Sequence, residues 1–299
     1  MRSLIAGILV VASLLLRCQG AQWLLEEECG DFSPIVGRMD NAENAKIATH
    51  PYMAYLYTPT EFQCSGSLIN HWFVLTTAHC IPDDLNIIVR LGEYNRRTKE
   101  DCVGRSCQGA TKEYQVDMAF KHDQYDPDQH TDNIGLLRLA ERVEYENHVS
   151  PICVFVNTAM QNRVAQLTWL TATSWGDVLK ELKLQRLPKE ECSNIYGRGL
   201  TFDEICAGKE YDKGGLCEGD LGAAQVRLMW HNRRKRSVQL GIASGMNSEC
   251  EKASILTDVV GYGDWIKRVV HLYGHVEETQ SLSEPSVWID YVSGFYKPL

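Results

Sequence analysis

Three short segments of the chain hold side chains whose types and spacing could do chemistry together. His79 lies in Leu-Thr-Thr-Ala-His-Cys at 75–80, Asp132 begins Asp-Asn-Ile-Gly-Leu-Leu-Arg-Leu at 132–139, and Leu221 lies in Cys-Glu-Gly-Asp-Leu-Gly at 217–222. A histidine can act as a general base near neutral pH, and a carboxylate can hold its ring in one orientation. A single histidine beside a cysteine is more often structural, so its interpretation depends on the neighbouring segments.

These segments and Phe-Gln-Cys-Ser-Gly-Ser-Leu-Ile at 62–69 resemble, in order and spacing, the trypsin/chymotrypsin-like S1 serine peptidases. The likeness runs from about Ile35 to Gly274. It implies an all-β fold of two antiparallel six-stranded barrels, with the site in the cleft between them and a C-terminal helix after them.

Two features look most like the arthropod clip-domain branch of that family. They are Leu-Gly-Glu-Tyr-Asn at 91–95 and the additional pair Cys102 and Cys107. Residues 21–34 form a short N-terminal segment with a single cysteine. A disulfide-stapled clip module is therefore not expected there.

The resemblance carries catalytic roles onto individual residues. His79 matches the general base, Asp132 the acid that orients it, and the backbone N–H groups of Gly219 and Leu221 the oxyanion hole. Leu221 also takes the position of the nucleophilic serine, and its hydrocarbon has neither a proton for His79 to remove nor a lone pair to attack a carbonyl. Loss of the nucleophile in a related triad costs about 10⁶ in turnover. We therefore expect His79 and Asp132 to be vestigial and to share a buried hydrogen bond with a structural role.

The implied specificity pocket also departs from the family pattern. Gly215 takes the place of the aspartate found in enzymes that cut after Lys or Arg, so a basic side chain would find no partner. In Ser244-Gly245-Met246 the usual aromatic residue is absent, and Met246 replaces a small residue. Ala223-Ala224 stands where the family has Gly-Pro, so a Cβ is added at a position where the family has glycine. We expect a blocked pocket and an altered oxyanion loop.

The activation step is expected to fail as well. Family zymogens are cut before the Ile of a segment like Ile35-Val36-Gly37, and the new terminus pairs with an acid that matches Asp220. No Lys or Arg lies between Cys29 and Ile35, and Pro34 precedes the expected cut. The chain should stay uncut, which leaves Asp220 without a terminal partner.

The N-terminus predicts secretion. Arg2, an apolar run over 4–16 and Cys18-Gln19-Gly20 indicate a signal peptide over residues 1–20. Arg17 ends the apolar run before the about 20 residues that a membrane span needs. Removal of the signal peptide takes away one of eleven cysteines and leaves ten, an even number that allows complete pairing in a secreted protein.

The resemblance implies how those ten cysteines pair. The pairs are Cys64–Cys80, Cys192–Cys206, Cys217–Cys250, Cys29–Cys153 and Cys102–Cys107. Zinc is the alternative use of so many cysteines, but no C-x-x-C spacing occurs. We expect no metal and no other cofactor.

Composition narrows the partners. The 299 residues are 44% hydrophobic and 23% charged, which is ordinary for a folded globular chain. The net charge of −9 is poorly suited to nucleic acid phosphates or anionic lipid. We therefore expect the partners to be proteins, and not nucleic acid or membrane lipid.

The secondary-structure pattern is mostly strand. Apolar residues alternate with polar ones over 114–120, and short apolar runs lie at 86–91 and 238–243. A helical face is convincing only over 262–273, before Gly274. Residues 275–299 are treated as an extension whose aromatic part, 288–296, either docks another protein or packs on its own domain.

The basic run Arg233-Arg234-Lys235-Arg236 admits two interpretations. One is a solvated turn between barrel strands. The other is a furin-type processing site or a patch for an acidic partner or glycan. No Asn-x-Ser/Thr sequon occurs in the chain, so N-glycosylation is not expected.

Three functions remain open. The favoured one is a secreted, catalytically inactive serine protease homologue that acts as cofactor, decoy or regulator in an extracellular proteolytic cascade such as arthropod immunity. Its partners would be proteases or their substrates. The alternatives are an active serine endopeptidase and an extracellular structural or transport protein.

Overall fold

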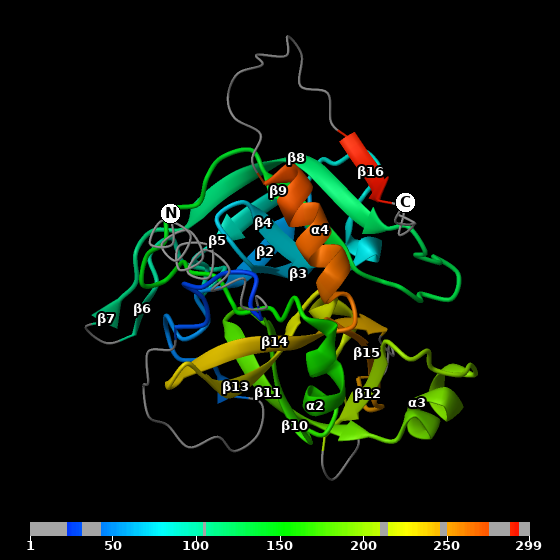
Figure 1. The fold of residues 1–299 in the computed structure, drawn as a ribbon. Coiled ribbons are helices and arrows are strands. Elements are labelled where there is room, and N and C mark those ends of the chain that lie inside the picture. Colours follow the sequence, from blue (N-terminus) through cyan, green and yellow to red (C-terminus); the bar gives the residue numbers. More distant parts are fainter. Residues whose placement is uncertain are drawn as a thin grey trace, which may run out of the picture.

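The computed structural model describes residues 23–31, 43–103, 106–209, 215–245, 250–274 and 288–292. Figure 1 shows two bodies of strands, one above the other, with a helix lying over the upper one. The expected signal peptide, Ile35 and Met246 lie outside the described residues. Among the described residues, no helix is both long and apolar enough to cross a membrane.

The upper body is a closed barrel of six antiparallel strands. In ring order they are β8 (Lys112–His122), β5 (Ile88–Leu91), β2 (Met53–Tyr57), β3 (Phe62–Leu68), β4 (Phe73–Thr76) and β9 (Gly135–Leu139). The ring closes because β8 also pairs with β9. A two-stranded ribbon of β6 (Cys102–Val103) and β7 (Ser106–Cys107) projects from it.

The lower body is a second closed barrel of six antiparallel strands. In ring order they are β11 (Leu179–Leu187), β10 (Trp169–Trp175), β13 (Ala224–His231), β14 (Arg234–Gly245), β15 (Ser254–Asp258) and β12 (Glu204–Gly208). Here β11 also pairs with β12, and β1 (Glu43–Asn44) adds to the outside of β11. The expected pair of six-stranded barrels is confirmed.

The helices of the described residues are few and short. They are α2 (Gln161–Val164), α3 (Lys189–Tyr196) and α4 (Gly263–Tyr273), with 3₁₀ turns η1 (Ala78–Cys80), η2 (Thr158–Met160) and η3 (Glu218–Asp220). The expected C-terminal helix is α4, which buries Trp265, Ile266 and Val269. Its three- and four-residue spacing places these side chains on one face, as the sequence pattern predicts.

The alternating pattern over 114–120 forms β8, with one irregularity. Tyr114 and Val116 are buried, but the register with β9 shifts between Val116 and Met118. Beyond the bulge, Ala119 packs in the same barrel core as Val116, three residues away, because the extra residue breaks the period of two. Phe120 is buried on the opposite face of the strand, in the cluster that joins the barrels and α4. The sequence pattern identified the strand but not its bulge.

Each barrel has its own apolar core, and a third cluster joins them. That third cluster takes side chains from both barrels and from α4, including Phe73, Leu75, Ile242 and Trp265. The site expected in the cleft is therefore framed by two packed bodies that are fixed to each other.

All five disulfides expected from the family resemblance are present in the structure. Cys29–Cys153 spans 124 residues and ties the N-terminal segment to the rest of the domain. In the chain-entropy model a bridge over a loop this long stabilises by about 4–5 kcal/mol. The other four pairs hold local loops and turns.

Part of the C-terminal extension packs on its own domain. β16 (Trp288–Val292) runs parallel to β8 and pairs with residues 118–122, beyond residues 112–115 where β5 pairs. Of the two interpretations of this segment, packing on its own domain therefore holds for its backbone. The strand covers an edge that would otherwise be open to strand pairing.

Candidate active site

His79 lies on η1, at the surface of the upper barrel. Its backbone N–H donates to Asn133 Oδ1 at 3.0 Å, and its ring stacks at 5.2 Å on that of His130. Partial burial of the ring, followed by the charges of His130 and Lys121, lowers the pKa of His79. The imidazole therefore favours its neutral form.

Asp132 does not orient His79, and this prediction is wrong. Its backbone has a φ of +51°, and its Oδ1 accepts a hydrogen bond from the Tyr262 hydroxyl at 2.9 Å. His122 Nδ1 lies 3.8 Å from the same oxygen. In the described part of the chain no hydrogen bond or ion pair joins Asp132 to His79, so the expected bond between them is absent. The positive φ turns the carboxylate towards α4 and away from the imidazole.

Asn133 is the residue that reaches His79, and sequence reasoning missed it. It is 1% exposed, and besides accepting from His79 it donates from Nδ2 to Ser244 O at 3.2 Å. These two partners fix which amide atom is oxygen and which is nitrogen. The Thr257 hydroxyl also donates to Asn133 O at 3.0 Å. Asn133 thus links the two barrels where the cleft begins.

An amide in this position has a chemical consequence. A carboxylate can stabilise a charged imidazolium and select the tautomer that leaves the other ring nitrogen free to take a proton. A neutral amide cannot supply that charge. The structure therefore gives His79 no carboxylate partner through either Asp132 or Asn133.

Leu221 bridges the barrels at the nucleophile position. Its side chain is partly buried against the core cluster of the upper barrel, and its carbonyl accepts from Ser65 N–H at 2.8 Å. Gly222 follows with a φ of +78°, and a Cβ there would lie 1.9 Å from Ser65 O. Glycine is therefore required at position 222, both by the backbone angle and by the close approach of Ser65.

Ala223 and Ala224 do not disturb the loop backbone as expected. Both are fully buried, and neither has a positive φ. Ala224 begins β13 and pairs with Ile242 in β14. A backbone outside the left-handed region accepts a Cβ, so the expectation of strain where alanine replaces the family's glycine is wrong.

Asp220 is held by its own loop. Its Oδ2 accepts from Cys217 N–H at 2.7 Å, while its own N–H donates to Cys217 O at 2.9 Å across η3. Burial raises the pKa of Asp220, and hydrogen bonds from Cys217 and Ser174 oppose this rise. Gly219, the other residue assigned to the oxyanion hole, is exposed on the same turn. Ile35, its expected activation partner, lies outside the described residues.

The base of the expected specificity pocket is filled. A Cβ on Gly215 would lie 2.3 Å from Ser254 Oγ and 2.5 Å from Lys252 O. Ser244 is 2% exposed, and its hydroxyl donates to Ile255 O at 3.3 Å. Tyr196 of α3 donates to Gly245 O and Ala253 O at 3.2 Å each. The described walls are thus bonded to each other.

A Gly215→Asp variant is expected to lose stability without gaining a site for basic side chains. Its Cβ would force apart Ser254 and the backbone at Lys252, and overpacking of this kind costs about 1–3 kcal/mol. Thermal unfolding and benzamidine binding measure the two effects. Tight benzamidine binding by a variant of unchanged stability would contradict this description of the pocket.

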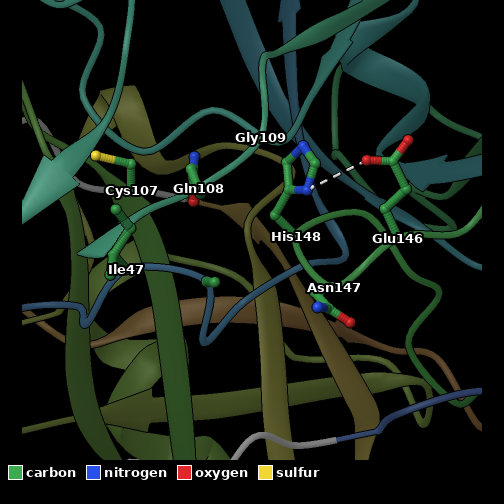
Figure 2. Close-up of a pocket in the computed structure, with 8 residues that line it drawn as sticks. Ile47, Cys107, Gln108, Gly109, Glu146, Asn147 and His148 are labelled. Carbon is green, nitrogen blue, oxygen red and sulfur yellow. Dashed lines mark ion pairs between the residues drawn. The ribbon is translucent and has the colours of Figure 1, made fainter. Parts of the chain in front are cut away.

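A cavity of about 600 Å³ lies elsewhere, beside the β6–β7 ribbon. Figure 2 shows Ile47 and Cys107 at one end of it and Gly109 beside His148 at the other, with Glu146 Oε2 3.7 Å from His148 Nδ1. None of the residues assigned to catalysis, the oxyanion hole or the specificity pocket lines it. Among the described residues, no three histidine, cysteine or acidic side chains gather as a metal site.

Comparison with known proteins decides the family. The trypsin family model matches residues 39–266. The chain belongs to the trypsin family. Its sequence similarity to clip-domain proteases also confirms the expected arthropod branch.

Two relatives and one solved structure illustrate that similarity. The chain is 32% identical over 249 residues to the CLIP domain-containing serine protease HP8 of Bombyx mori, covering 74% of this chain and 66% of HP8. It is 27% identical over 274 residues to the clotting factor G beta subunit of Tachypleus tridentatus, covering 82% and 83%. The crystal structure of the Drosophila Grass clip serine protease of the Toll pathway matches with a TM-score of 0.74 and 24% identity, covering 87% of this chain and 78% of Grass. The chain thus spans about two thirds of the length of HP8.

The basic run of this trypsin-family chain lies on a β-hairpin. His231 pairs with Arg234, so Asn232 and Arg233 form a two-residue turn in which both have positive φ. Arg236 is buried in β14, and its Nη1 donates to Cys29 O. A processing protease that needs the Arg236 side chain must first open this hairpin, so the structure favours the reading as a turn.

Proposed function

We propose that this trypsin-family chain is a secreted, catalytically inactive homologue that acts by binding in an extracellular proteolytic cascade. It serves as a cofactor, decoy or regulator of proteases or of their substrates. The observation that carries the proposal is Leu221 at the nucleophile position, packed on the core of the upper barrel. A hydrocarbon offers no atom to form an acyl-enzyme.

The surroundings of Leu221 support the same conclusion. Asn133, with its neutral amide, is the residue bonded to the backbone of His79, and Gly215 has no room for a side chain. By contrast, five disulfides and two complete barrels are retained. A stable scaffold without the catalytic groups is suited to presenting a surface.

Secretion and cascade membership rest on two further supports. Five disulfides fit an oxidising compartment, as does the expected signal peptide over residues 1–20. Among the similar proteins, one is named a clotting factor subunit and another a protease of the Toll pathway. These names support our proposal that the chain takes part in an extracellular cascade of proteases.

The alternative of an active endopeptidase needs a different nucleophile. Ser244, Ser65 and Ser254 lie in the neighbouring strands, and all three are buried. The Ser244 hydroxyl is bonded to Ile255 O, and Ser254 Oγ accepts from Leu216 N–H. Neither arrangement presents an alkoxide to a substrate carbonyl.

An add-back experiment tests the proposal. Haemolymph plasma depleted of the protein should activate its target protease at an altered rate, and purified wild-type chain should restore the rate. The matched variant His79→Ala should restore it equally, because binding does not use the imidazole. Failure of His79→Ala to restore the rate would contradict the proposal. Capture of haemolymph proteins on immobilised chain with no protease or protease substrate among them would favour the structural or transport alternative.

A further inference from the structure

The β13–β14 hairpin carries a stretch of strand edge that is not paired. β13 pairs with β14 from Ala224 to His231, but with β10 only at Gln225 and Val226. Over residues 228–231 the other edge of β13 meets no strand in the described part of the chain. Figure 1 shows the two strands running together to the side of the lower barrel. A free edge of this kind can accept one more strand.

The same stretch exposes large apolar side chains. Trp230 is 70% exposed and Leu228 is 44% exposed. They are two residues apart on one strand, so they point to the same face. Lys235 pairs with Trp230 across the hairpin, and its Nζ lies 5.5 Å from the centre of the indole ring. Exposed tryptophan is typical of contact surfaces.

The charge of the hairpin is opposite to that of the whole chain. Residues 222–248 contain five Lys or Arg and no Asp or Glu, although the chain carries −9. Arg233, Arg234 and Lys235 are exposed, and none of them forms an ion pair with another described residue. Arg236 differs, because it is buried and lies 3.8 Å from Asp31. Three exposed cations thus lie near an exposed indole ring and near an edge that no strand of the described residues pairs with.

We propose that this hairpin tip binds an extended acidic segment of a partner protein. The segment adds as a strand to β13 over residues 228–231, with apolar side chains on Leu228 and Trp230 and carboxylates beside Arg233, Arg234 and Lys235. The inference rests on the proposed function, since it names the surface through which the chain binds. Charge complementarity selects the acidic partner, and the free backbone edge selects the extended conformation.

A fluorescently labelled Val-Glu-Val-Glu-Val-Glu-Val peptide is the probe, and its anisotropy is measured against purified full-length chain. Wild type should bind it, and binding should weaken as salt rises from about 50 to about 300 mM, because exposed charges are screened. The triple variant Arg233→Gln/Arg234→Gln/Lys235→Gln should bind at least about tenfold more weakly. The control Arg97→Gln/Arg163→Gln/Lys267→Gln removes the same charge from other exposed positions and should bind as wild type does.

Two further reagents separate strand addition from charge and from misfolding. A peptide N-methylated at every residue has no backbone N–H to donate to β13 and should lose about tenfold in affinity. Arg233→Gly removes a cation from a position with a φ of +65°, where glycine is favoured, so it should bind more weakly while unfolding no more easily than wild type.

Equal binding by wild type and the triple Gln variant would overturn the proposal, as would full binding of the N-methylated peptide. Binding of heparin oligosaccharides without binding of the peptide would also overturn the proposal, because the partner would then be a glycan. Self-association in sedimentation that the triple Gln variant abolishes would make the occupant a second copy. None of these results bears on the add-back of His79→Ala, so the binding function and its surface can fail separately.

Discussion

A Leu221→Ser variant is expected to hydrolyse no peptide substrate and to show no labelling by a fluorophosphonate above background. The new hydroxyl would take the nucleophile position, but no carboxylate would orient the His79 imidazole. In a related triad, replacing the orienting acid by its amide lowers turnover by about 10⁴. The exposed ring of His79 stacks on His130 instead. Gel fluorescence with a labelled fluorophosphonate and a peptide assay measure both expectations.

The paired change Leu221→Ser/Asn133→Asp should recover labelling. A carboxylate at Asn133 would replace the amide that now bonds the His79 backbone, and labelling should rise by about 10³–10⁴ over Leu221→Ser alone. The matched control is Leu221→Ser/Asp132→Asn, which should label no differently from Leu221→Ser. A loss of labelling when Asp132→Asn is added to Leu221→Ser would show that Asp132 orients the base and that Asn133 does not.

Gly222→Ala is expected to destabilise the fold by more than about 3 kcal/mol, or to prevent folding. The added Cβ would lie 1.9 Å from Ser65 O, and the residue would also have to keep a φ of +78°. The clash falls where Leu221 and Ser65 join the two barrels, so neither side can move without breaking that contact. Denaturant unfolding followed by tryptophan fluorescence measures the loss.

Gly197→Ala is the matched control for the steric part of that loss. Gly197 has a φ of +69°, but a Cβ there would meet nothing within 4 Å. It should cost only the backbone strain of a left-handed residue, about 1 kcal/mol. If the two variants lose equal stability, the close approach of Gly222 to Ser65 is not what makes glycine necessary.

The barrels, the disulfides and α4 could be predicted from the sequence. Ten paired cysteines and the motif order point to one scaffold, and the three- and four-residue spacing of Trp265, Ile266 and Val269 is unambiguous for a helix. The helix depends on a local pattern that a linear sequence records, whereas the two barrels and the disulfide pairing were implied by the resemblance of the motifs to a known family. The loss of the nucleophile at Leu221 could also be predicted from the sequence, because the residue type alone shows that the side chain has no hydroxyl group.

The choice between Asp132 and Asn133 could not be made from residue types alone. Both are short polar residues that tolerate a left-handed backbone, and which one turns outward depends on a single φ angle. The positive φ falls on Asp132, so its side chain goes to Tyr262 and Asn133 goes to the buried side. One signal was present: Asn133 directly precedes Ile134, the fully buried residue before β9.

The state of the pocket likewise needed coordinates. The sequence shows that Gly215 lacks an acid, but not that Ser254 and the Lys252 backbone occupy the space an acid would take. It also shows the basic run, but not that Arg236 is buried while Arg233, Arg234 and Lys235 are exposed. Such facts depend on contacts between segments far apart in the chain.

Purified wild-type chain offers the most direct measurement. It should show no fluorophosphonate labelling and no peptide cleavage beyond the buffer rate, in an assay where active trypsin shows both. Cleavage at an enzyme-like rate by the wild type, abolished in His79→Ala, would contradict the account, because an imidazole with no serine to activate would then be driving catalysis.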